Sequence, residues 1–452
     1  SIADANKGFK VLQGSELTIT PIVDSFLETS YSWQINGEDI SNELTCTLPT
    51  IELGEYQVRF ATHNEDGDDE VTFKVEVCSP DQVDFNWTFL QTEYNMSAGR
   101  TIRIKPVDVN NALDAVYTWT VDNEQVQSGE NDTYLFTSEQ QGEHTVKVEM
   151  KNSYILATQT LKVNVCPPAG TYQRKISATS SASMNKVYEY LPAPGQFINE
   201  NHNTTTMAEA CTYAEERINQ TAYVSLGGFG GYIIVGFDHS IVNDGDYNIA
   251  ITGNAFDGSS EPGIVWVMQD ENGDGLPNDT WYELRGSEYG KAETWQDYAV
   301  TYHKPTGIQL PTPWTDNHGQ SGSIDYLGAF HRQDYYYPAW VKEKQYTLRG
   351  TRLKERNYDQ SGNGTYWVND SYEWGYADNF SAIDRLTDDD NYNAGPSDNH
   401  FKISHAVTFD GKDANLKYVD FIKVQVGVNS KSGWLGEIST EVFGIKDFNM
   451  LK

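Results

Sequence analysis

The sequence predicts a mostly β protein, in which two small tandem β-sandwiches precede a large β-sandwich or jelly-roll-like domain with long loops. Runs such as "YQVRF" and "HTVKVEM" alternate apolar and polar residues, which is the period of a half-buried strand. One stretch of the chain repeats, and the last part is filled with short β-branched and aromatic runs between Gly and Asn. The 452 residues exceed the ~250–300 at which a single core stops growing, so several domains are expected.

The repeat defines the first two domains. The segment Leu17–Cys78 aligns with Ile102–Cys166, and the final cysteines of the two copies are 88 residues apart. That spacing is the size of one small sandwich domain, and turn residues separate the alternating runs in each copy. We therefore expect one module at residues 1–79 and a second at residues 80–168.

The third domain is expected to span residues 169–452. Pro167 and Pro168 end the second repeat, because proline cannot donate a hydrogen bond to a strand ladder. Strand-like runs recur from Tyr223 onward, which favours one large antiparallel domain. A short helix is predicted in "NTTTMAEACTYAEERINQ", whose apolar residues recur at near-helical spacing: Met207, Ala210, Cys211, Ala214 and Ile218.

Charge and composition exclude some functions. The 32 basic and 65 acidic residues give a formal charge of -33, so nucleic acid or an anionic bilayer would be repelled. No run approaches the ~20 apolar residues of a membrane span. The polar start at Ser1 is typical of the trimmed end of an exported protein or of a tether. The four cysteines lack metal-binding spacing, which favours buried thiols, although three disulfide pairings are possible.

The acidic loop "DENGDGLPND", residues 270–279, predicts a structural calcium site. Alternating oxygen donors and a glycine at the sharp turn match the start of an oxygen-rich calcium loop. The expected ligands are Asp270, Asn272, Asp274, the Leu276 carbonyl and Asp279. Glu283 is a weaker closing ligand, and Trp281 stands where an acid is usual. The alternative is a solvated turn without an ion, and under both interpretations the loop sets the register of its flanking strands.

Aromatic residues in polar loops are the predicted ligand-binding site. Tyr and Trp combine a large apolar face with one polar group, which suits an amphipathic ligand such as a sugar or a planar macrocycle. For any single residue, packing in the core is an equal alternative. The preferred contacts are Tyr336, Trp340, Trp374, Tyr376 and Trp434, with Trp314 and Trp367 as further contacts.

The sequence contains no recognisable catalytic motif. GxSxG, HExxH and phosphate-binding loops are absent, and the nine histidines lack ligand spacing. Asp378 with Glu437 or Glu373 could form the acid pair of a glycosidase, but such pairs are common among 65 acids. We therefore expect a protein that is not an enzyme.

The first two modules resemble PKD-like and other immunoglobulin-like domains. Trp33 and Trp119 each lie on an early strand, and "GEYQVRF…HNEDG" has the expected order of turn, strand and Asn-containing turn. "WQINGED" departs from the usual Trp-x-Phe-Gly-Asp-Gly run. The resemblance implies that these modules act as spacers that hold a functional domain away from a surface.

The third domain is similar to PKD-containing cell-surface lipoproteins of gut Bacteroidetes. Its blocks include "GNAFDGSSEPGIVWVMQDENGDGLPNDTWYELRGSEY", "WGYADN" and "GVNSKSGWLGEISTEVFGIKDF". One branch resembles the accessory cobalamin-binding lipoproteins that work beside TonB-dependent transporters. The resemblance implies an outer-membrane protein exposed at the cell surface, held by an N-terminal lipid anchor that this chain does not include. Cobalamin is then the leading ligand, a glycan of a polysaccharide utilisation system is the alternative, and glycoside hydrolysis is less favoured.

Overall fold

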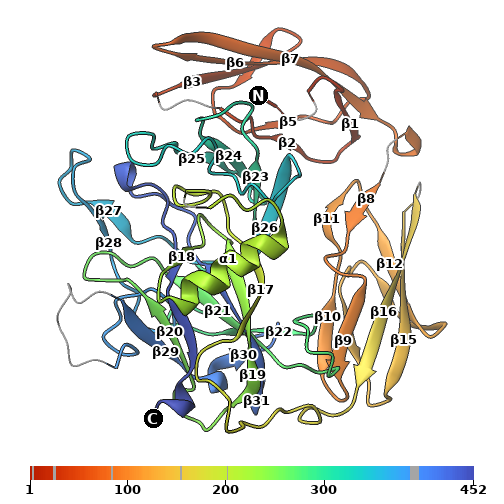
Figure 1. Cartoon of the computed structure of the whole chain (residues 1–452). Coiled ribbons are helices and arrows are strands. Elements are labelled where there is room, and N and C mark those ends of the chain that lie inside the picture. The colour runs from red at the N-terminus through yellow and green to blue at the C-terminus, as the bar shows by residue number, and fades with distance from the viewer. Residues whose placement is uncertain (3–4, 24–26, 83–84, 153–154, 201, 387–395) are drawn as a thin grey trace. The chain divides into compact units, whose positions relative to one another are not determined.

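The computed structural model describes the chain except residues 3–4, 24–26, 83–84, 153–154, 201 and 387–395. The described residues form 33 strands and one α-helix, so the predicted mostly β fold is confirmed (Figure 1). The chain divides into two compact units. Unit 1 comprises residues 1–168 and 318–322, and unit 2 comprises residues 169–317 and 323–452.

The first part of unit 1 is a sandwich of a five-stranded and a two-stranded sheet. The larger sheet has the order β1-β7-β6-β3-β4, and β2 pairs with β5 in the smaller. The strands are β1 (Phe9–Leu12), β2 (Leu17–Ile19), β3 (Ser30–Ile35), β4 (Glu38–Ser41), β5 (Cys46–Leu48), β6 (Gly54–Asn64) and β7 (Gly67–Cys78). Trp33 lies fully buried at the centre of this core, and its Nε1 donates to the Glu43 carbonyl at 2.9 Å.

The second part of unit 1 repeats this arrangement around Trp119, which is also fully buried. A five-stranded sheet has the order β13-β12-β15-β16-β9, and β10 pairs with β14 and β11 with β8. The elements are η1 (Pro80–Gln82), β8 (Asn86–Thr88), β9 (Glu93–Ser97), β10 (Thr101–Ile104), β11 (Val107–Asn110), β12 (Val116–Val121), β13 (Glu124–Gly129), β14 (Tyr134–Thr137), β15 (Gly142–Lys151) and β16 (Leu156–Cys166). Along β15, buried and exposed residues alternate as the sequence predicts.

Both parts of unit 1 close in the same way, by a parallel pairing of an early strand with the last one. In the first, β1 pairs with β7 from Phe9 opposite Val75 to Leu12 opposite Cys78. In the second, β9 pairs with β16 and ends with Ser97 opposite Cys166. Cys78 and Cys166, which end these last strands, are buried thiols, as expected.

Unit 2 is built on a six-stranded antiparallel sheet with the order β17-β19-β31-β21-β22-β30. Its central strands lack alternation because both faces are covered, and nearly every residue of β31 is buried. Smaller sheets have the orders β29-β20-β33, β25-β24-β23-β26, β18-β32 and β27-β28.

The strands of these sheets are β17 (Lys186–Leu191), β18 (Val224–Ser225), β19 (Tyr232–Val242), β20 (Ile249–Gly253), β21 (Gly263–Met268), β22 (Trp281–Leu284), β23 (Trp295–His303), β24 (Thr312–Asp316), β25 (Ser321–Ile324), β26 (Gln345–Arg352), β27 (Asn357–Asp359), β28 (Trp367–Asn369), β29 (Ser397–Phe401), β30 (Ala406–Val407), β31 (Tyr418–Val426), β32 (Glu441–Val442) and β33 (Gly444–Asp447). Three short 3-10 helices accompany them, η2 (Ile403–His405), η3 (Gly433–Leu435) and η4 (Phe448–Met450).

The predicted helix is present as α1, Met207–Asn219, and it packs beside β17 (Figure 1). Thr206 and Glu209 form a capping box that satisfies the first backbone amides of the helix. Ala210, Ala214 and Ile218 form its buried face, in agreement with the predicted apolar spacing. Among the helices of the described residues, none is long and apolar enough to cross a membrane.

A glycine-rich turn, residues 227–231, directly precedes β19 and lets two backbone segments approach closely. Gly227 has a φ of +70°, and a Cβ on it would lie 2.0 Å from the Ala193 carbonyl oxygen. A Cβ on Gly231 would lie 1.8 Å from the Leu226 carbonyl oxygen. That oxygen accepts a hydrogen bond from the Ala193 amide at 3.0 Å, so the two segments have no room for a side chain.

Candidate functional site

Three aromatic residues predicted to contact a ligand lie in the hydrophobic core instead. Tyr336, Trp340 and Tyr376 are 1%, 6% and 2% exposed. Tyr336 Oη donates to the His331 carbonyl at 3.0 Å, and Trp340 Nε1 donates to the Tyr190 carbonyl at 3.2 Å. Their large faces pack against other core side chains, which is the alternative interpretation of such residues. The prediction that these three rings meet a ligand is therefore corrected to core packing.

Trp434, by contrast, is 50% exposed and is held on a tightly bonded turn. The Ser432 amide donates to the Gly436 carbonyl at 2.9 Å, and the Leu435 amide donates to the Ser432 carbonyl at 3.0 Å. Gln196 Nε2 adds a hydrogen bond of 2.6 Å to the Leu435 carbonyl from a distant part of the chain. The turn therefore presents the indole from a fixed backbone.

Two neighbours extend the apolar area around this indole. Phe330, which the sequence analysis did not single out, is 65% exposed, and its ring centroid lies 6.2 Å from that of Trp434. The half-buried Trp367 packs so closely on Gly433, the residue before Trp434, that a Cβ on this glycine would lie 2.2 Å from the Trp367 indole nitrogen. Leu435 is also exposed. We call Phe330, Trp367, Trp434 and Leu435 the aromatic surface.

The remaining predicted aromatics lie elsewhere in unit 2. Trp314 on β24 is half-buried and packs against the main core. Trp374 lines a cavity of about 250 Å³ together with Arg285 and His405, and its ring centroid lies 5.1 Å from that of His405. A ligand pocket usually measures ~300–1,000 Å³, so this cavity has room for one small ring but not for a macrocycle.

The acidic loop joins β21 to β22 and sets their register, with Trp266 opposite Glu283 and Met268 opposite Trp281. Its carboxylates bind the loop's own backbone amides. Asp270 accepts from Gly273 at 2.8 Å and from Gly275 at 3.0 Å. The scaffolding role expected for the loop agrees with this geometry.

The individual calcium ligands predicted in the loop are placed as follows. The Asp274 carboxylate accepts from the Leu276 amide at 2.7 Å and from the Asn272 side chain at 2.9 Å. Asp279 accepts from the Glu271 amide at 3.0 Å, and burial raises its pKa to about 8. Glu283 lies apart on β22, where it accepts from Thr351 Oγ1, so its suggested role in closing the loop is corrected.

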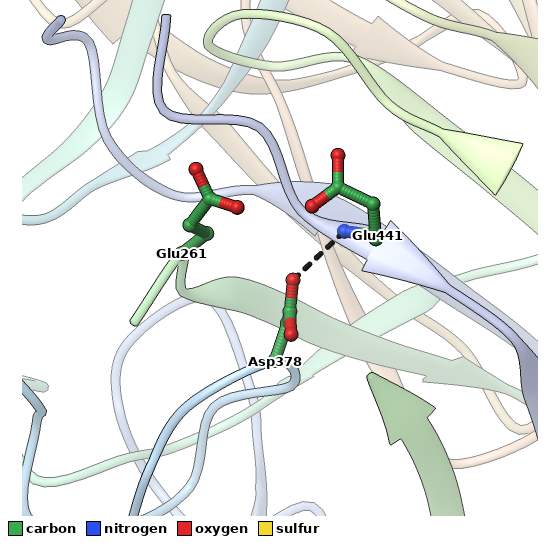
Figure 2. A group of neighbouring side chains, drawn as sticks. All are labelled: Glu261, Asp378 and Glu441. Atoms are coloured by element: carbon green, nitrogen blue, oxygen red, sulfur yellow. Dashed lines mark hydrogen bonds between the residues drawn. The ribbon is translucent and has the colours of Figure 1, made fainter. Parts of the chain in front are cut away.

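A second group of carboxylates was not predicted, except for Asp378. Glu261 precedes β21, Asp378 lies in the loop after β28, and Glu441 begins β32. One oxygen from each lies within 4.8 Å of the others, and Figure 2 shows the three carboxyl groups turned toward a common point. Among the described residues, no other set of three Asp, Glu, His or Cys side chains brings its ligand atoms this close. We call these three residues the carboxylate cluster.

Backbone hydrogen bonds hold the carboxylate cluster in place. Asp378 has a φ of +53°, and its Oδ2 accepts from the Glu441 amide at 2.9 Å. Its Oδ1 accepts from the Asn254 amide at 2.8 Å, and its carbonyl accepts from the Glu261 amide at 2.9 Å. Burial raises the pKa of all three carboxyl groups, and the charges of the other members raise those of Asp378 and Glu441 further. Thr440 Oγ1 also donates to the Glu261 carbonyl, at 2.9 Å.

The acids considered for a glycosidase differ in their exposure to solvent. Asp378 is 1% exposed, and Glu437 is 4% exposed with one oxygen accepting from the Gln196 amide at 2.7 Å. Glu373 lies exposed on the surface. The two buried acids thus present almost no surface to a sugar ring.

The N-terminal part of the chain matches a known family of domains. A model of the PKD-like domain matches residues 1–64 and residues 89–152, so the chain contains PKD-like domains ahead of unit 2. No curated protein matches the chain.

Several solved structures are similar to part of the chain. The fibronectin(III)-like modules of Clostridium thermocellum CbhA are 16% identical, with 39% of this chain and 98% of that chain covered and a TM-score of 0.19. Titin domains z1z2 in complex with telethonin are 21% identical over 36% of this chain and 93% of that chain, with a TM-score of 0.18. The N-terminal four Ig domains of a Dscam1 isoform are 14% identical over 35% and 43%, with a TM-score of 0.18.

Proposed function

We propose that this chain is a non-catalytic capture protein that binds an amphipathic ligand on unit 2. The observation that carries the proposal is the aromatic surface, where Trp434, on its hydrogen-bonded turn, is exposed beside Phe330 from a distant part of the chain. A folded protein normally buries such rings, and exposed aromatic anchors are typical of binding sites. The PKD-like modules would act as a spacer between unit 2 and the membrane.

The leading ligand is cobalamin, delivered to a TonB-dependent outer-membrane transporter. A corrin ring is broad and amphipathic, so its face suits an open aromatic surface better than the 250 Å³ cavity beside Trp374. The third domain resembles a group of cell-surface lipoproteins, one branch of which is similar to cobalamin-binding lipoproteins, and this favours the same ligand. It also supports display at the outer face of the outer membrane through an N-terminal lipid anchor.

A glycan is the alternative ligand, because sugar rings also stack on exposed Trp and Phe. Glycoside hydrolysis is less favoured, since Asp378 and Glu437 are both buried. A structural calcium ion in the acidic loop remains part of the proposal. It would replace the loop's amides as partner of Asp270 and Asp274 and would stabilise the β21–β22 hairpin.

Ligand titration of the full chain tests this function. Isothermal titration with cyanocobalamin, and then with a panel of glycans, is compared between the wild type, Trp434→Ala and Phe330→Ala. Loss of a stacked ring should weaken binding by about 10- to 100-fold, which corresponds to a loss of ~1.4–2.8 kcal/mol. Phe256→Ala is the matched control, because Phe256 is 49% exposed in a different turn of unit 2.

Three other outcomes would change the assignment. Binding to glycans alone would make the chain a glycan-binding protein. Sugar release during that assay would show that it is an enzyme. Equal weakening by Phe256→Ala would show that the aromatic surface is not the site.

A further inference from the structure

The carboxylate cluster lies inside unit 2. Asp378 and Glu441 are buried, and Glu261 is only partly exposed. Among the described residues, no Lys, Arg or His forms an ion pair with any of the three. A buried carboxylate without a counter-charge is strongly unfavourable, so the cluster must hold protons or a bound cation.

The spacing of the oxygens matches a hard divalent cation. Calcium binds oxygens at about 2.3–2.6 Å, so two oxygens on opposite sides of the ion are separated by about 5 Å. The three cluster oxygens all lie within 4.8 Å of one another. The donor set contains only oxygen, which disfavours zinc and copper and suits calcium, magnesium or manganese. Calcium tolerates irregular geometry, whereas magnesium demands a near-ideal octahedron.

Two unpartnered oxygens point independently to a missing ligand. Glu441 is 4% exposed, and its Oε1 has no hydrogen-bond partner in the described part of the chain. Glu437 is equally buried, and its Oε2 also lacks a partner. Buried carboxylate oxygens are nearly always bonded, so each such atom calls for a specific explanation. In Figure 2 the Glu441 carboxyl group faces that of Glu261 across the space above Asp378.

We infer that Glu261, Asp378 and Glu441 form a calcium site that joins three distant segments of unit 2. The ion would link the start of β21, the loop after β28 and the start of β32. Glu437, four residues before Glu441, would add its unpartnered oxygen directly or through a water. This site is separate from the acidic loop, and it does not rest on the proposed capture function.

Calcium binding by the full chain tests the inference. The acidic loop is first silenced by Asp270→Asn and Asp274→Asn, so that any remaining site is counted alone. This chain is stripped with EDTA, returned to chelator-free buffer and titrated with CaCl2. We expect it to bind one calcium ion, and calcium at about 100 times its Kd should raise the Tm by about 5–10 °C.

Adding Glu441→Gln to the loop-silenced chain should weaken calcium binding by about 100-fold and remove the rise in Tm. The variant is expected to fold, because the amide is uncharged, has nearly the same size as the carboxyl group and can donate to the neighbouring carboxylate. Its metal-free Tm should therefore equal or exceed that of the parent. Glu373→Gln, which changes an exposed acid, is the matched control and should leave calcium binding intact.

The inference is overturned if the loop-silenced chain binds no calcium, because protons alone would then neutralise the cluster. Binding that survives Glu441→Gln unchanged would also overturn it. Neither result depends on cyanocobalamin or glycan binding, so failure of this inference and failure of the capture function can be told apart.

Discussion

Replacing Trp340 and Trp434 separately by Ala should give opposite results for stability and binding. Trp340 is 6% exposed, and its indole contacts the rings of Tyr190 and His202 at centroid distances of 5.6 and 5.8 Å. A buried Trp removes up to ~250 Å² from water, which at ~25 cal/mol/Å² corresponds to about 5 kcal/mol. Loss of the hydrogen bond from Nε1 to the Tyr190 carbonyl adds to this cost.

Trp434 is half exposed, so Trp434→Ala should cost about 1–2 kcal/mol. For a domain of this size each kcal/mol lowers the Tm by ~2–4 °C. The two variants should therefore differ in Tm by about 6–16 °C in differential scanning calorimetry, with Trp340→Ala the lower. Ligand affinity should fall only for Trp434→Ala at temperatures where both variants are folded. If Trp340→Ala melts with the wild type, or if the two variants melt together, the division of these residues into core and surface is wrong.

Two further predictions concern unit 2. Burial, with a smaller effect of the Arg217 charge, lowers the pKa of His202 to about 4, so the unfolded chain binds a proton below pH 6.5 that the folded chain does not. Stability should therefore fall as the pH drops from 6.5 to 4, by up to about 3 kcal/mol, and His202→Gln should lose this part of the pH dependence in thermal melts; equal slopes for both chains would contradict the assignment. Gly231→Ala should lower the free energy of unfolding by at least about 3 kcal/mol in urea, because the new Cβ would overlap the Leu226 carbonyl oxygen. Gly290 is the control, because it is exposed, has a φ of +78° and has open space around it, so Gly290→Ala should cost only about 1 kcal/mol.

The strand pattern of unit 1 was predictable because each strand has one face in the core. In β15 the buried residues Val146, Val148 and Met150 alternate with exposed ones, which gives the period of two directly. The helix α1 was predictable for the matching reason, since its apolar residues recur at helical spacing and Thr206 caps it. In β31 nearly every residue is buried, so the sequence indicates a buried strand but not its neighbours.

The candidate-site residues were less predictable, because exposure of an aromatic ring depends on distant parts of the chain. Trp340 and Trp434 both lie in polar segments that contain glycine or proline, and the local sequence does not distinguish the buried residue from the exposed one. Phe330 lies beside Trp434 only in the folded chain, 104 positions earlier in sequence. In the carboxylate cluster, Glu261 and Glu441 are two of the 65 acids of the chain, and no local motif distinguishes them. Only the strand order of unit 2 brings them together with Asp378.

The parallel pairing that closes each PKD-like module also determines how it would respond to a mechanical load. When a chain is pulled by its two ends, force enters the first module at the start of β1 and leaves it at the end of β7. Because the two strands run in the same direction from Phe9 and Val75 to Leu12 and Cys78, their hydrogen bonds are loaded together in shear. Bonds loaded together must break almost at once, whereas a hairpin pulled from its open end loses them one at a time. A tether made of such modules would therefore lengthen little under drag, and its lifetime under load would be governed by the unfolding rate.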